Sequence, residues 1–195
     1  MPDRQSTLAL VHEWTQSPSL RSHMLAVEAA MRAYATKLGE DADKWGMTGL
    51  VHDFDYERYP NDAQAADAEH PAEGVRHLRS LGYPDDVCEA ILGHARYTGV
   101  PRTTRLAKAL FAVDELCGLV TATALVRPSR SVHDVDVRSV QKKFKDKAFA
   151  RGVSREDIVD GAAELGVPLD EHIGVVIAAL QGVAGDLGLA GPGPV

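Results

Sequence analysis

The sequence predicts an all-α protein, and three observations favour this class. Apolar residues recur at spacings of three and four along most of the chain, which is the period of an amphipathic helix. No run of alternating polar and apolar residues is long enough to predict a strand. The helical segments are separated by capping residues, glycines and prolines, which are typical of helix ends.

The first half of the chain divides into helices and one long loop. A short helix carries Leu8, Val11 and Trp14 on one face, and Ser17 then offers an N-cap for a helix over residues 20–38. An acidic first turn from Asp41 opens the third helix, which we expect to end at residue 52 or 53. We expect residues 54–69 to form a loop that is long for a compact domain, and such loops are often functional.

The remaining helices follow the same rules. We expect them over residues 71–81, 86–96, 105–126, 135–150, 154–165 and 169–187, with residues 188–195 as a frayed tail. Residues 1–128 then form the main helical domain. Residues 129–195 form a helical extension packed on it as one structural unit.

The composition excludes several classes of protein. The 195 residues are 45% hydrophobic and 25% charged, which excludes wholesale disorder. The net charge of −7 argues against a general nucleic-acid or anionic-membrane binder. Cys88 and Cys117 are too few for a disulfide framework or a four-thiolate zinc site, and we expect both in the core. With no targeting segment and no bilayer-length apolar run, we expect a cytoplasmic protein.

One adjacent pair, His52-Asp53, stands at the end of the third expected helix. Imidazole and carboxylate together suit Fe, Mn, Zn, Co or Ni better than Ca²⁺. The pair alone is weak evidence, because His133-Asp134 repeats it in the same chain.

Four further residues strengthen the prediction of a metal site. His23, His70 and His94 each lie on, or at the edge of, a different expected helix. Asp114 lies in an apolar stretch, which is a poor place for an unpaired carboxylate. Helices that converge on one axis would bring all six groups together, as in the metal sites of helix bundles.

The order of these six residues resembles the HD-domain superfamily of metal-dependent phosphohydrolases. The segments His70-Pro71 with Glu73-Gly74, Ile91-Leu92-Gly93-His94 and Asp114-Glu115-Leu116 are similar to those of the two-metal, HDIG-type members. The resemblance covers about residues 20–125. It implies an HD-type helical bundle with a C-terminal helical extension.

The resemblance also implies a ligand set and a reaction. His23, His52, Asp53 and Asp114 would hold one divalent metal, and Asp53 would bridge to a second metal held by His70 and His94. A metal-activated hydroxide would then attack the phosphate ester of a small metabolite or nucleotide. Three alternatives remain open: a one-metal site in which His70 or His94 contacts substrate, a mixed-valence di-iron oxygenase, and a non-catalytic module that binds a phosphorylated ligand.

The chain departs from the HDIG pattern after the His-Asp pair. It continues Phe54-Asp55-Tyr56-Glu57, which resembles an HDFDYE subgroup of predicted hydrolases of undefined substrate. Asp55 or Glu57 would act as a general acid or order a metal-bound water. Alternatively, these residues are solvated loop acids or orient a ligand.

A basic cluster stands out in this acidic protein. It runs through Lys142, Lys145 and Arg151, and it is either a solvated helix face or, with Arg127, a phosphate clamp over the metals. Arg96 and Tyr97 follow His94 directly and are candidates for substrate contact. We expect the other histidines to be surface or structural residues: His12, His77, His133 and His172.

Overall fold

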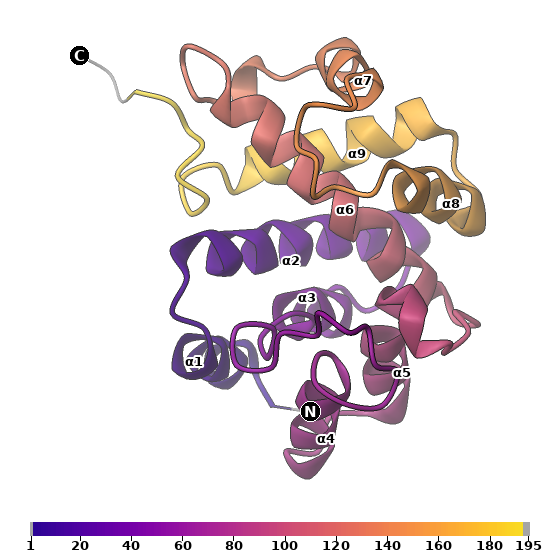
Figure 1. Ribbon diagram of the computed structural model, residues 1–195. Helices are drawn as coiled ribbons and strands as arrows, with labels where there is room; N and C mark the ends of the chain where they lie inside the picture. The colour runs from indigo at the N-terminus through magenta and orange to yellow at the C-terminus, as the bar shows by residue number, and fades with distance from the viewer. Residues whose placement is uncertain (1, 193–195) are drawn as a thin grey trace.

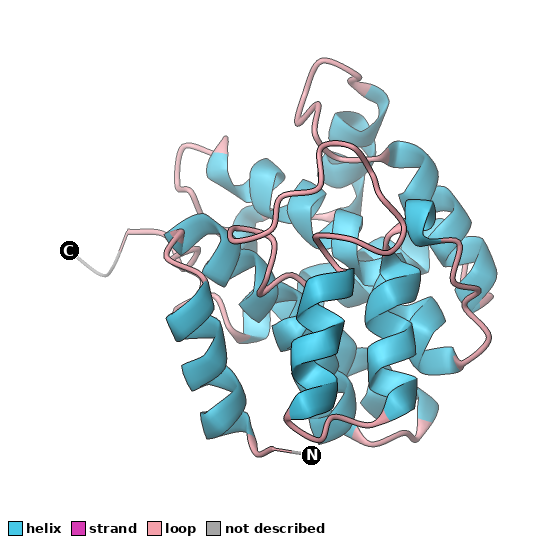
Figure 2. Ribbon diagram, turned by 60° about the horizontal axis from the view of Figure 1, so that its bottom comes forward, coloured by secondary structure: helices cyan, strands magenta, loops and turns pink. Residues whose placement is uncertain are grey.

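The computed structural model describes residues 2–192, which fold into helices without an extended strand (Figure 2). The all-α prediction is therefore confirmed, and one isolated antiparallel bridge joins Ser131 to Ala190. The α-helices are α1 (Arg4–Trp14), α2 (Pro18–Leu38), α3 (Ala42–Val51), α4 (Ala72–Ser80), α5 (Asp85–His94), α6 (Arg105–Leu125), α7 (Val137–Lys145), α8 (Arg155–Leu165) and α9 (Leu169–Gly182). Short 3-10 turns follow α5 and α6 as η1 (Arg96–Thr98) and η2 (Val132–Asp134).

Side-chain caps stand at the starts of several helices, including the N-cap predicted at Ser17. Ser17 caps α2 by accepting from the Leu20 amide, and Asp41 caps α3. Ser154 caps α8 in the same way. Gly39 ends α2 in the left-handed conformation, which glycine adopts without steric cost.

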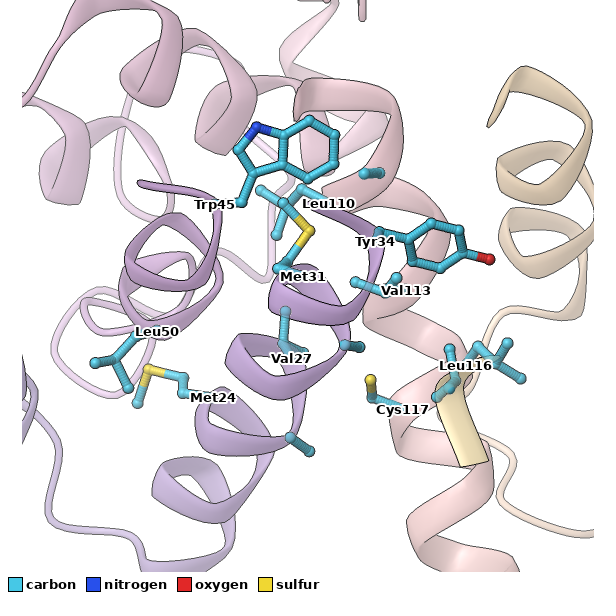
Figure 3. Close-up of a cluster of buried hydrophobic side chains, with 14 of the residues drawn as sticks. Met24, Val27, Met31, Tyr34, Trp45, Leu50, Leu110, Val113, Leu116 and Cys117 are labelled. Carbon is cyan, nitrogen blue, oxygen red and sulfur yellow. The ribbon is translucent and has the colours of Figure 1, made fainter. Parts of the chain in front are cut away.

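Two long helices organise the molecule. In Figure 1, α1, α3 and α4 lie on one side of α2, α9 lies on the other, and α6 crosses α2. Figure 3 shows the core between them, where Met24, Val27 and Met31 of α2 meet Leu50 of α3 and Leu110 of α6. All five side chains are fully buried. Buried residues of α8 and α9 belong to the same hydrophobic cluster.

Two predicted boundaries are wrong in the last third of the chain. The helix expected to reach residue 150 ends at Lys145, because the guanidinium of Arg155 binds the carbonyls of Phe149, Ala150 and Val153 and holds this segment as a loop. The helix expected to reach residue 187 ends at Gly182.

The expected frayed tail is also wrong for the part that the structure describes. Leu189 is buried, and its carbonyl accepts from the Val132 amide at 2.9 Å. Residues 188–192 therefore pack back against η2, while residues 193–195 lie outside the described residues.

Among residues 2–192, no helix combines the length and the apolar character that crossing a bilayer requires.

Candidate metal centre

The structure brings the six predicted metal ligands into one cluster. They come from four helices and one loop: α2, the end of α3, the loop before α4, the last residue of α5 and the middle of α6. In chain order they are His23, His52, Asp53, His70, His94 and Asp114.

Asp53 lies at the centre of this cluster. Its Oδ2 lies 3.2 Å from His52 Nε2. Its Oδ1 lies 3.4 Å from His70 Nε2 and 3.3 Å from His94 Nε2. The two oxygens of one carboxylate therefore face different imidazoles, which is the arrangement that a bridging ligand requires.

Asp114 closes the other side of the cluster. Its Oδ1 lies 2.9 Å from His23 Nε2 and 3.4 Å from His52 Nε2. Asp53 Oδ2 is 3.8 Å from His23 Nε2. Two groups of ligand atoms lie close enough to share an ion, namely His23 with His52 and Asp114, and His52 with Asp53 and His94.

Local backbone contacts orient two of the imidazoles. His52 Nδ1 lies 2.8 Å from the Gly49 carbonyl, and His94 Nδ1 lies 2.5 Å from the Ile91 carbonyl. A carbonyl only accepts, so Nδ1 carries the proton in both rings. Each Nε2 then faces Asp53 and is the nitrogen that would bind a metal ion in place of a proton, as in metal-binding histidines.

Asp55 orients the third imidazole from a fully buried position. Its Oδ1 accepts from His70 Nδ1 at 2.7 Å, and its Oδ2 accepts from the Gly74 amide at 2.7 Å. Both oxygens are thereby occupied behind His70, away from the open side of the cluster. The predicted role as a general acid is therefore corrected, and the alternative of an orienting residue is favoured.

These residues fit divalent transition metals. His52 Nε2 is buried without a hydrogen-bond partner, although a carboxylate oxygen lies 3.2 Å away. A lone pair facing a carboxylate is repelled unless a cation or a proton lies between them. Several imidazole lone pairs and two carboxylates form a donor set for Fe, Mn, Zn, Co or Ni.

The pKa values of the clustered residues also show that this site favours a positive charge beside its carboxylates. Burial lowers the pKa of His52, but the negative charges of Asp53 and Asp114 outweigh burial and hold it well above its usual value. Burial raises the pKa of Asp53, but His52 and its neighbours hold it well below its usual range. The site is built for two carboxylates that remain ionised.

A cavity of about 870 Å³ opens over this cluster. Three aromatic side chains line it, namely Tyr56, Tyr97 and Phe111. Tyr97 donates its hydroxyl to the His70 carbonyl at 3.0 Å. The cavity therefore joins the metal cluster to a wall with both aromatic and charged groups.

Arg96 lines the cavity as predicted, but its guanidinium is already paired. It binds Asp157 and, at 2.7 Å, Asp160, both from α8. The group also lies 5.0 Å from the centre of the Phe111 ring. In this structure Asp157 and Asp160 bind the guanidinium of Arg96, which was expected to contact substrate.

The other predicted substrate cations do not line the cavity. Arg127 follows α6, and Lys142 and Lys145 lie on α7, which packs against α6 and α9. At 1.5 Å rise per residue, the end of α6 is about 16 Å beyond Asp114. The predicted phosphate clamp is therefore not formed in this structure, because none of these three side chains lines the cavity.

Glu57 is also placed away from the cavity. Its Oε2 accepts from the amides of Gln16 at 2.8 Å and Ser17 at 2.9 Å. It therefore ties the loop after α3 to the start of α2. The prediction that Glu57 is catalytic is therefore corrected, because its carboxylate binds the backbone at the start of α2.

Glu115 is a cavity residue for which no function was predicted from the sequence. It follows Asp114, and its Oε2 accepts from the Ser154 amide at 3.0 Å. Burial and the charge of Asp114 raise the pKa of Glu115 to about 7. The only signal in the sequence was a charged residue within an apolar helix.

The remaining histidines lie outside the cluster, with His12 and His133 exposed on the surface and His77 and His172 packed against other side chains. The ring of His77 lies 4.5 Å from that of Trp14. His172 is buried between the Tyr34 hydroxyl, at 2.6 Å, and the Ala112 carbonyl, at 2.8 Å. Both cysteines are buried in the core, as predicted.

Comparison with known proteins agrees with this geometry. A family model described as the HD domain matches residues 20–119, which is just over half of the chain. The chain belongs to the HD-domain family. No curated protein and no solved structure gave a match.

Proteins of this family are largely metal-dependent hydrolases, and the matched segment of this HD domain contains all six clustered residues. Helix α8, which supplies Asp157 to the cavity, lies outside the matched segment.

Proposed function

We propose that this HD-domain protein is a metal-dependent phosphohydrolase that acts on the phosphate ester of a small metabolite or nucleotide. The observation that carries the proposal is the convergence of the His52, His70 and His94 Nε2 atoms on the Asp53 carboxylate. The six clustered residues would hold divalent metal ions, and Asp53 offers one oxygen to His52 and the other to His70 and His94. When bound, such ions lower the pKa of a shared water and stabilise charge on phosphoryl oxygens.

The chain's own residues would position the reactants. Asp55 holds His70 in the tautomer that leaves Nε2 free, and the backbone carbonyls of Gly49 and Ile91 do the same for His52 and His94. The cavity over the cluster is large enough for a phosphate ester together with its alcohol part.

Asp53→Ala tests the proposal. The protein is purified without metal, loaded separately with Mn, Fe, Co, Ni or Zn, and assayed on p-nitrophenyl phosphate and bis(p-nitrophenyl) phosphate. We expect metal-dependent hydrolysis by the unmodified protein. Asp53→Ala is expected to lose it while keeping its circular dichroism spectrum, because within residues 2–192 no other carboxylate lies near as many imidazoles as Asp53.

Asp134→Ala provides the matched control. Asp134 follows a histidine just as Asp53 does, but it is exposed and lies outside the cluster. This variant is expected to keep full activity. Retained activity in Asp53→Ala would contradict the assignment of the site, and oxygen consumption by an iron-loaded protein inactive on both esters would favour an oxygenase instead.

A further inference from the structure

The charged lining of the cavity is unbalanced outside the metal cluster. Three acidic residues from α6 and α8 line the cavity together with the cluster, namely Glu115, Glu156 and Asp157. Among the described lining residues, Arg96 is the single lysine or arginine. The charged groups that line the cavity beside the cluster are therefore mainly acidic, and these three residues form its acidic wall.

The one arginine does not offset this charge for a ligand. Arg96 is bound by two carboxylates, Asp157 within the cavity and Asp160 beside it. Within residues 2–192, neither Glu115 nor Glu156 forms an ion pair with a lysine, arginine or histidine. Glu115 accepts one backbone hydrogen bond from Ser154, which leaves its Oε1 available.

A second observation points to a ligand in this cavity. The buried His52 Nε2, which has no hydrogen-bond partner, faces Asp53, and Asp53 lines the cavity together with the acidic residues. Cations held by the cluster would attract a phosphoryl dianion. The volume of about 870 Å³ far exceeds one phosphate group, so the cavity also has room for the alcohol part of the ester beside the acidic residues.

We propose that the substrate is a phosphate monoester of an amino alcohol, with its phosphoryl group at the metals and its ammonium group beside Glu115 and Glu156. This inference rests on the proposed function. Hydrolysis consumes one water: a bond forms between phosphorus and the water oxygen, the ester bond from phosphorus to oxygen breaks, and the alcohol leaves with a proton from that water. The ammonium group takes no part in the reaction and serves for recognition.

The same wall excludes other phosphate esters. A polyphosphate or a phosphorylated carboxylic acid would place a second anion against Glu115 and Glu156. Like charges at such distances are repelled, and no free lysine or arginine among the described lining residues compensates.

Three esters of nearly equal size test the inference. They are 2-aminoethyl phosphate, n-propyl phosphate and carboxymethyl phosphate, whose alcohol parts are cationic, neutral and anionic. With the Mn-loaded protein at pH 8, kcat/KM is expected to fall by about tenfold or more at each step in that order.

Binding gives a second measurement that does not depend on turnover. The phosphonates that replace the ester oxygen by a methylene group are 3-aminopropylphosphonate, butylphosphonate and 2-carboxyethylphosphonate. Isothermal titration calorimetry on the Mn-loaded protein is expected to give the same order of affinity.

The variants Glu115→Gln and Glu156→Gln identify the residues responsible. Both keep the size of the side chain, and together they are expected to bring the kcat/KM ratio of the aminoethyl to the propyl ester to about one. The matched control is Glu89→Gln, which changes an exposed acid of α5 outside the cavity and is expected to leave that ratio unchanged. Circular dichroism verifies folding, and each single variant is measured if the double variant misfolds.

The outcomes separate the two proposals. Hydrolysis of p-nitrophenyl phosphate with equal or reversed preference among the three esters would overturn the inference and leave the phosphohydrolase proposal intact. Hydrolysis of bis(p-nitrophenyl) phosphate alone would likewise overturn the inference and leave the phosphohydrolase proposal intact. If no metal supports hydrolysis of any ester, both proposals are wrong.

Discussion

At the scale of single residues, Asp55 shows that the groups around a carboxylate determine its role. Its sequence position, two residues after Asp53, suggested a role in proton transfer. The structure surrounds it with the two N–H groups of His70 Nδ1 and the Gly74 amide. A carboxylate with both oxygens occupied by donors is an acceptor that fixes a tautomer, and it has no proton to give.

Asp55→Asn is expected to weaken metal binding by about 10- to 100-fold, as loss of a partner behind a metal ligand commonly does. Asparagine has one acceptor oxygen, so its amide group would face either the His70 or the Gly74 N–H. Metal content and affinity, measured by titration with a competing chelator, give the readout.

Asp62→Asn is the matched control for this change. It removes the same charge from an exposed position of the same loop. It is expected to bind metal as the unmodified protein does. Equal metal affinity in Asp55→Asn and in the control would show that His70 does not need this orientation.

At the scale of elements, the position of α8 against α6 depends on one glycine. A Cβ at Gly161 would lie 2.6 Å from the Cα of Ala112, which is closer than packed atoms approach. The two helices therefore touch through backbone, and this contact brings the start of α8 to the cavity.

Gly161→Ala is expected to destabilise the fold by about 1–3 kcal/mol, because the new methyl group has to displace the α6 backbone. Denaturant unfolding measures the change. Gly174→Ala on α9 is the control, because its Cβ would lie at an ordinary 3.9 Å from Val137. That change is expected to stabilise the protein by about 0.5–1 kcal/mol, and equal effects of the two substitutions would contradict the close contact.

At the scale of the whole molecule, the metal cluster ties together helices that are far apart in the sequence. His23 and Asp114 are separated by 91 residues and meet at 2.9 Å. Two carboxylates held beside several imidazole lone pairs strain the fold when no cation is present. A metal ion bound at this cluster would therefore stabilise the fold.

Removal of metal is expected to lower the melting temperature of the unmodified protein. Saturation at 100 times the dissociation constant adds about 2.7 kcal/mol, which corresponds to roughly 5–10 °C for a protein of this size. Calorimetry with and without a chelator measures the shift. Asp53→Ala is expected to show almost no shift, and an equal shift in that variant would place the stabilising ion elsewhere.

Much of the fold could be predicted because it depends on local chemistry. Helical periodicity and the caps at Ser17, Asp41 and Ser154 act within a few residues, so they located most helices. The errors came where distant contacts compete with local propensity. Arg155 holds residues 149–153 in a loop, and the contact of Leu189 with Val132 orders the described part of the tail.

By itself, the sequence determined the helical class, most helix starts and, through its resemblance to the HD-domain superfamily, the six residues that the fold brings together, since donor chemistry and order are properties of the chain. Only the tertiary structure decided what the neighbouring charges do. Arg96 meets Asp160 across 64 residues, Glu57 reaches Gln16 across 41, and the basic residues of α7 do not line the cavity. The role of a charged side chain depends on which opposite charges and N–H groups surround it, and packing brings those groups together from distant parts of the chain.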